Sequence, residues 1–144
     1  MKNMMRLTIE DDVELLKRYG LAMALCNSVD YMLGEYIRLE GGLHNANQEI
    51  VNALMDEKTF VRKIKLANKL ISDETLKAEL SKSLEDRNLL AHGVSGDQDG
   101  QKILMFNKGS HPLTVESLDA IIGRARELSG GIFKEIQKRF KLDG

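Results

Sequence analysis

Hydrophobic side chains recur every three or four residues over most of the chain, which is the spacing of α-helices that bury one face. The first such stretch predicts a long helix from about Ile9 to about Leu39, which follows an N-cap at Thr8 and ends at Glu40-Gly41-Gly42. Its inward stripe comprises Leu15, Ala22, Cys26, Val29, Leu33 and Tyr36.

Three further helices are expected in the middle of the chain. A short one from Ile50 to Met55 follows the polar loop His44–Gln48, and the next runs from about Glu57 to Ile71 after a cap at Asp56. Its inward residues are Phe60, Ile64, Ala67 and Ile71. A third helix, from about Glu74 to His92, is opened by Ser72-Asp73 and closed by Gly93, where a left-handed C-cap residue is expected.

The pattern changes after Gly93. Val94-Ser95-Gly96, a turn at Asp97–Gly100 and the alternating run Lys102–Phe106 predict a small β-hairpin, followed by turns at Asn107–Gly109 and His111-Pro112. Two strands alone are marginally stable, so the hairpin should pack on the helices.

A last helix is expected to begin after the N-cap Thr114, with Leu113 and Leu118 as a hydrophobic staple and a kink or interruption at Ser129–Gly131. Its inward stripe comprises Val115, Leu118, Ile122, Ala125, Ile132, Ile136 and Phe140. The sequence therefore predicts an all-α class: one domain over residues 1–144, an up-and-down bundle of four to five helices with a small β-hairpin insert near residues 94–106.

Composition agrees with this picture and excludes several classes of protein. With 144 residues, 42% hydrophobic and 30% charged, the chain suits one globular domain. The single Cys26 excludes an intramolecular disulfide, and no Cys/His cluster suits zinc, so no metal or cofactor is expected. No apolar run reaches the roughly 20 residues of a membrane span, and the N-terminus turns acidic too soon for a secretory signal, which predicts a cytoplasmic protein.

Candidate chemistry is concentrated in the segment Arg87-Asn88-Leu89-Leu90-Ala91-His92. On a helical wheel Arg87 falls in an apolar stripe, with Leu76, Leu80, Leu84 and Ala91 all within roughly 60° of it. Asn88 lies roughly 100° round from Arg87 and His92 roughly 140° round, so the three polar groups share one flank. A guanidinium in an apolar stripe needs a partner: a buried acid, exposure at the edge of the bundle, or an anionic ligand.

The pattern Arg-Asn-x-x-x-His at the end of a helix resembles the signature of HEPN domains, which are small all-α modules that include many metal-independent RNases. Arg87, Asn88 and His92 match its three positions. The resemblance implies that these residues are catalytic, that no cofactor or metal is used, and that the chain forms a homodimer in which two motifs line a shared cleft.

An imidazole and a guanidinium suit RNA transesterification. The 2′-hydroxyl attacks the adjacent phosphorus, His92 assists proton transfer and Arg87 stabilises the developing charge, while Asn88 orients the phosphate or His92. The products are a 2′,3′-cyclic phosphate and a 5′-hydroxyl.

Two alternatives remain open. The chain could be a catalytically silent HEPN module that binds nucleotides or a protein partner and dimerises. It could also be the toxin or defence effector of a pair, with an antitoxin protein as partner, which is compatible with catalysis.

The net charge of −1 does not favour binding of RNA by overall electrostatics, so any RNA contact must come from a local basic patch. The candidates repeat along one side of the Glu57–Ile71 helix and could equally form a solvated face: Lys58, Arg62, Lys65 and Lys69. His44 and His111 are assigned to loops and are expected to have no catalytic role.

Overall fold

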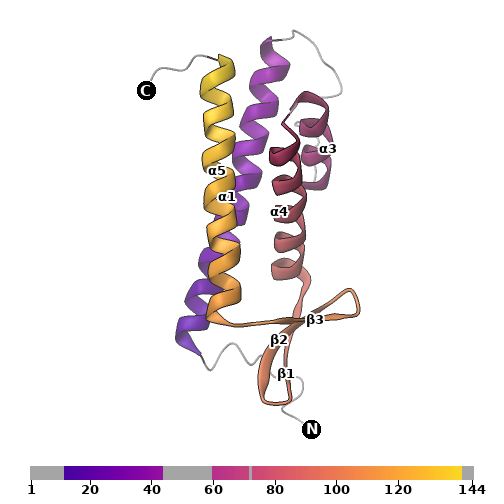
Figure 1. Ribbon diagram of the computed structural model, residues 1–144, viewed down its shortest axis with the longest axis vertical. Coiled ribbons are helices and arrows are strands. Elements are labelled where there is room, and N and C mark those ends of the chain that lie inside the picture. The colour runs from indigo at the N-terminus through magenta and orange to yellow at the C-terminus, as the bar shows by residue number, and fades with distance from the viewer. Residues whose placement is uncertain (1–11, 44–59, 72, 141–144) are drawn as a thin grey trace.

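The computed structural model describes residues 12–43, 60–71 and 73–140. Four helices dominate it: α1 (Val13–Leu43), α3 (Phe60–Leu70), α4 (Glu74–His92) and α5 (Val115–Phe140). Figure 1 shows α1 and α5 packed side by side, with α4 antiparallel to both and α3 beside α4. The mostly helical bundle predicted from the sequence is confirmed. The expected loop at His44–Gln48, the short helix after it and the cap at Asp56 lie outside the described residues.

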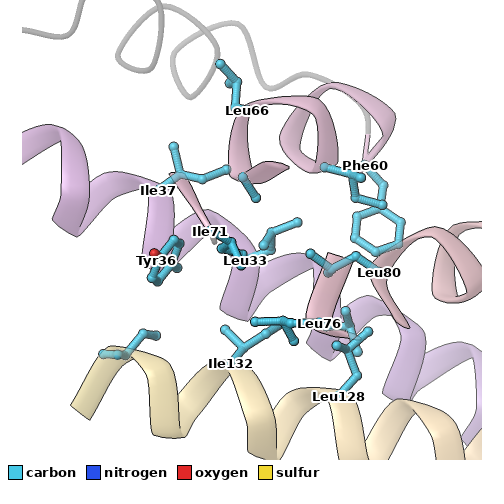
Figure 2. Close-up of a cluster of buried hydrophobic side chains, with 14 of the residues drawn as sticks. Leu33, Tyr36, Ile37, Phe60, Leu66, Ile71, Leu76, Leu80, Leu128 and Ile132 are labelled. Carbon is cyan, nitrogen blue, oxygen red and sulfur yellow. The ribbon is translucent and has the colours of Figure 1, made fainter. Parts of the chain in front are cut away.

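The core consists of two clusters of buried side chains. One joins α1, α3, α4 and the second half of α5, and Figure 2 shows many of its members, among them Tyr36, Phe60 and Leu80. The other joins the first half of α1, the start of α5 and the sheet through Cys26, Leu90 and Leu104. The inward stripes predicted for α1 and α3 are buried in full.

Helix ends follow the local sequence. The Asp73 carboxylate accepts hydrogen bonds from the backbone N–H groups of Thr75 (2.9 Å) and Leu76 (3.2 Å), which caps α4. Before α5, the N–H of Ser117 donates to Thr114 Oγ1 and the N–H of Thr114 donates to Ser117 Oγ, both at 3.0 Å. The cap predicted at Thr114 is confirmed.

The interruption expected at Ser129–Gly131 is wrong, because α5 is one continuous helix through these residues. A glycine in a helix costs only about 1 kcal/mol. The fully buried Leu128 and Ile132 on either side anchor both halves of the helix in the same core cluster, which outweighs that cost.

The insert is a three-stranded antiparallel sheet in the order β1 (Val94–Gln98), β2 (Gln101–Phe106) and β3 (Gly109–Pro112). The predicted hairpin is confirmed as β1–β2, but the turn predicted at His111-Pro112 is wrong: these residues form the end of β3. Asp99 and Gly100 have φ of 51° and 81°, and Asn107 and Lys108 have φ of 51° and 63°. Both two-residue turns therefore have the left-handed conformations of tight hairpins. The sequence predicts the turn at Asn107–Gly109 but not the strand after it, because Gly109–Pro112 has no alternating hydrophobic residues and ends in a proline.

Gly93 ends α4, although not as predicted. Its φ of −68° and ψ of 146° are extended, not left-handed. Its N–H donates to the carbonyl oxygen of Leu89 (2.8 Å), and a Cβ at this position would overlap that same oxygen. Glycine is needed here for space, because the chain turns directly from the last helical bond into β1.

Gly93→Ala should destabilise the fold by about 1–3 kcal/mol, because the new methyl group must displace either Leu89 or the start of β1. Urea unfolding checks this. Gly130→Ala is the matched control: a Cβ there meets nothing within 4 Å and Gly130 lies exposed inside α5, so this change should stabilise by about 0.5–1 kcal/mol. Equal stability of the two variants would contradict the steric role of Gly93.

Candidate functional site

Helix α4 remains helical through His92, so it carries Arg87, Asn88 and His92 in fixed angular positions. Asn88 and His92 lie roughly 100° and 140° round the helix from Arg87, so both are on the half of α4 that faces away from it. The three polar groups therefore do not act from one flank as predicted: Arg87 contacts Phe60 of α3, whereas His92 contacts Phe106 of β2.

Arg87 lies on the side of α4 that faces α3. Its guanidinium carbon is 5.9 Å from the centre of the Phe60 ring, a cation–π contact. Its Nε is buried and has no hydrogen-bond partner within the described part of the chain. Of the three possible partners of Arg87, a buried acid is therefore not found among the described residues.

The buried acid of this region is Asp86, which pairs with Arg124 of α5. Two bonds join them, from Arg124 Nε to Oδ2 (2.8 Å) and from Nη2 to Oδ1 (2.9 Å). The Lys82 ammonium lies 4.0 Å from the same carboxylate. The hydrogen bond to Asp86 is the main cause that raises the pKa of Arg124.

Sequence reasoning missed this ion pair, although a signal was present. Asp86 lies at helical spacing between Ser83 and Leu90, and all three are buried. Arg124 lies likewise between the buried Ile121 and Leu128. The buried face of α4 is therefore centred between Arg87 and Asp86 instead of on Arg87.

Asn88 borders a depression between α4 and the sheet, with a volume of about 500 Å³. From α4 it is lined by Lys82, Glu85, Asp86, Asn88 and Leu89, and from the sheet by Phe106, Asn107, Gly109 and His111. The depression combines amide, carboxylate, ammonium and imidazole groups around one aromatic ring, so it can offer both hydrogen bonds and proton transfer to a ligand.

His92 is exposed at the end of α4 and stacks on Phe106, with ring centroids 6.5 Å apart and planes inclined by 22°. Because Phe106 also lines the depression, His92 and Asn88 share a neighbour that Arg87 does not touch. The structure thus brings together two of the three motif residues.

His111 is the functional candidate that sequence reasoning placed wrongly. In the β2–β3 register it pairs with Leu104, and Gly109 pairs with Phe106. Since side chains alternate along a strand, His111 and Phe106 lie on the same face of the sheet. The third strand, which the sequence pattern does not predict, brings His111 to the depression.

The apolar stripe that carries Arg87 is occupied within the chain. Leu76 and Leu80 are buried in the core, and Leu84 packs against it. Of this stripe only Ala91 is exposed, so little of it is free to form an interface. Near the motif, the exposed apolar side chains are instead Val94 (58% exposed) and Met105 (46%), which pair across β1 and β2.

The predicted basic stripe is exposed along α3 at Arg62, Lys65 and Lys69, while Lys58 lies outside the described residues. The neighbouring Lys63 is engaged with Asp30 at 2.9 Å. Exposure is compatible both with an RNA contact and with a solvated face.

The thiol of Cys26 is buried, as the sequence indicates. Burial, followed by the nearby Asp86, raises the pKa of Cys26 to about 11, against smaller opposite effects of Arg87 and Arg124. It is therefore protonated and unreactive at neutral pH. Among the described residues, no cluster of His, Cys, Asp or Glu has the arrangement of a metal site, and none of the helices there has the length and apolarity to cross a membrane.

Comparison of the chain with protein-family models, with curated proteins and with solved structures finds no match in any of the three.

Arg124→Ala should lower stability by about 1–3 kcal/mol, because among the described residues it leaves the buried Asp86 carboxylate with Lys82, 4.0 Å away, as its remaining ion-pair partner. Urea unfolding measures the loss. Arg126→Ala, at an exposed position two residues away, should change stability by less than about 0.5 kcal/mol.

Replacing both partners, in Asp86→Leu with Arg124→Leu, should recover most of the loss, since no unpaired charge is left inside. If Arg124→Ala unfolds at the same urea concentration as Arg126→Ala, the ion pair does not hold α4 against α5.

Proposed function

We propose that this chain is a HEPN-type, metal-independent endoribonuclease that cleaves RNA through attack of the 2′-hydroxyl. The observation that carries the proposal is the end of α4, where the exposed His92 and the half-buried Asn88 flank Phe106 at the edge of a 500 Å³ depression. The match of Arg87, Asn88 and His92 to the family signature supports the same reading.

The proposed reaction needs one proton removed and one supplied. As the 2′-oxygen bonds to phosphorus, its proton passes to a base. The bond from phosphorus to the 5′-oxygen breaks, and that oxygen takes a proton as it leaves. His92 takes part in this transfer, Asn88 orients the phosphate or the imidazole, and Arg87 stabilises the charge that develops on the phosphate.

The positions of Arg87 and His92 support a homodimer. Within one chain Arg87 is directed to Phe60 of α3 while His92 stacks on Phe106 of β2. A two-fold axis beside the end of α4 can bring Arg87 of one protomer towards His92 of the other. The exposed pair Val94 and Met105, next to the motif, is the apolar surface available for such an interface.

The biological setting completes the proposal. A small cytoplasmic RNase of this kind suits a toxin or defence effector that an antitoxin protein keeps inactive. The RNA backbone could follow the basic stripe of Arg62, Lys65 and Lys69 on α3, together with Lys58.

A catalytically silent module that binds a nucleotide or a protein is the second candidate. One observation favours the protein-binding form of this candidate: the depression beside Asn88 also holds the carboxylate of Glu85, which repels the phosphates of RNA and of a nucleotide alike. In this case Arg87 and His92 would bind a ligand without cleaving it.

His92→Ala should lower the rate of RNA cleavage by roughly 10²–10⁴-fold, the usual contribution of general acid–base catalysis. Because His92 is exposed, the melting temperature of the His92→Ala variant should stay near that of the parent protein. The assay uses single-stranded RNA in EDTA and identifies the 2′,3′-cyclic phosphate. Cleavage that EDTA abolishes, or that persists in His92→Ala, contradicts the assignment.

Arg87→Ala should abolish cleavage and leave the melting temperature equal or higher, because the change removes a half-buried charge that has no acid partner in the described region. Thermal unfolding and the same RNA assay give the two readouts, with Arg126→Ala as the control. Lost stability together with lost cleavage would indicate a structural arginine instead.

A homodimer predicts a mass of about 32 kDa, twice the chain mass of 16.2 kDa, by light scattering at micromolar concentration. Met105→Glu should convert it to a monomer, since a charge is placed in the apolar interface, and should abolish cleavage with it. A parent protein that is monomeric and cleaves RNA would refute the shared cleft.

A further inference from the structure

The described part of the chain contains two imidazoles, one stacked on Phe106 and the other in the depression that Phe106 lines. His92 stacks on its ring, while His111 lines the same depression as Phe106 and Asn88. These two side chains come from different elements, one from the end of α4 and the other from β3. A single chain therefore presents two titratable groups suited to proton transfer on one surface.

The sheet holds His111 in this position. Its backbone pairs with Leu104, which is buried in the core, so β3 is anchored on the strand that packs against the helices. A Cβ at residue 109 would lie 3.5 Å from His111 Nε2 and 3.5 Å from the carbonyl oxygen of Phe106. Because residue 109 is glycine, this edge of the imidazole is left uncovered.

The charged groups around His111 come from two helices. Lys82, Glu85 and Asp86 of α4 line the depression with it, and Arg124 of α5 lines an adjoining one. Asp86 and Arg124 are bound to each other. On β2 its neighbours across the strand, Leu104 and Phe106, are uncharged. His111 thus faces solvent and charges of both signs, and it is half-buried, so the ring has a defined position without being sealed from a ligand.

We propose that His111 is a second catalytic residue of the RNase, which exchanges a proton with the substrate on the opposite side of the phosphate from His92. This inference rests on the proposed function. One imidazole takes the proton of the 2′-hydroxyl while the oxygen–phosphorus bond forms. The other, protonated beforehand, gives its proton to the 5′-oxygen as the bond from phosphorus breaks. The step conserves charge and atoms and leaves the two imidazoles with exchanged protonation states, which water restores.

Two variants of His111 test the inference on the full-length protein with a single-stranded RNA oligonucleotide in EDTA. His111→Ala and His111→Gln should each lower the cleavage rate by roughly 10²–10⁴-fold. The glutamine keeps the size and the hydrogen bonds of the side chain but cannot titrate, so its loss separates proton transfer from positioning. Ser110→Ala, the exposed neighbour on the other face of β3, should cleave at the parent rate.

The dependence of the cleavage rate on pH distinguishes the two roles. If His111 were only structural, replacing it would not change the shape of this pH profile. With one imidazole acting as base and one as acid, the parent profile should be bell-shaped. His92→Ala and His111→Gln should each lose one limb of the bell, and they should lose opposite limbs.

A modified substrate identifies the acid. When sulfur replaces the 5′-oxygen, the leaving group departs without a proton, so the variant that lacks the acid should cleave this RNA near the parent rate while the other variant stays slow. Circular dichroism and melting temperature, measured for each variant, show that the fold is kept.

The possible failures are distinct. A parent protein that cleaves RNA, with His111→Gln cleaving equally fast and with the same pH profile, overturns the role of His111 and leaves the proposed function intact. A parent protein that does not cleave RNA overturns the proposed function itself.

Discussion

The ion pair between Asp86 and Arg124 fixes how α4 is rotated in the bundle, and the surroundings of the motif follow from this rotation. Asp86 is only 5% exposed, and a carboxylate so buried must keep its guanidinium partner, because an unpaired charge there costs several kcal/mol. With Asp86 held against α5, the next residue, Arg87, is directed roughly 100° further round, towards α3. Asn88 and His92 then fall on the opposite half of the helix, where the sheet lies.

The sheet turns the end of a helix into a pocketed surface. Gly93 allows the chain to leave α4 with no intervening loop, and β2 returns Phe106 to a position beside His92. The third strand then adds His111 to the wall that Asn88 shares. A helix alone presents a convex surface, so the concave site depends on this small sheet and on the buried Leu104 that attaches it to the core.

Any proposed function must account for the fact that Arg87 and His92 are separated within one chain. The two side chains contact different elements, Phe60 of α3 and Phe106 of β2. In the proposed RNase, a two-fold axis supplies the arginine from the other protomer, and His111 supplies a second imidazole within the same chain. In a catalytically silent module, Arg87 and His92 would not need to come together, because binding requires no concerted proton transfer.

The local sequence by itself determined the four described helices in outline, the inward faces of α1 and α3 and the caps at Asp73 and Thr114, because these depend on residues within a few positions of one another. The predicted start of the first helix at about Ile9 is wrong, since α1 begins at Val13, where the Asp12 carboxylate accepts from the N–H of Leu15. It also determined that Cys26 is buried. Tertiary structure decided the rest. The pairing of Asp86 with Arg124 spans 38 residues, and a wheel drawn for one helix cannot show which neighbour covers which face. The third strand escaped notice because Gly109–Pro112 has no alternating hydrophobic residues and ends in a proline, although the turn before it was predicted. The place of His111 followed from that strand, since only strand pairing could carry a residue assigned to a loop to the end of α4.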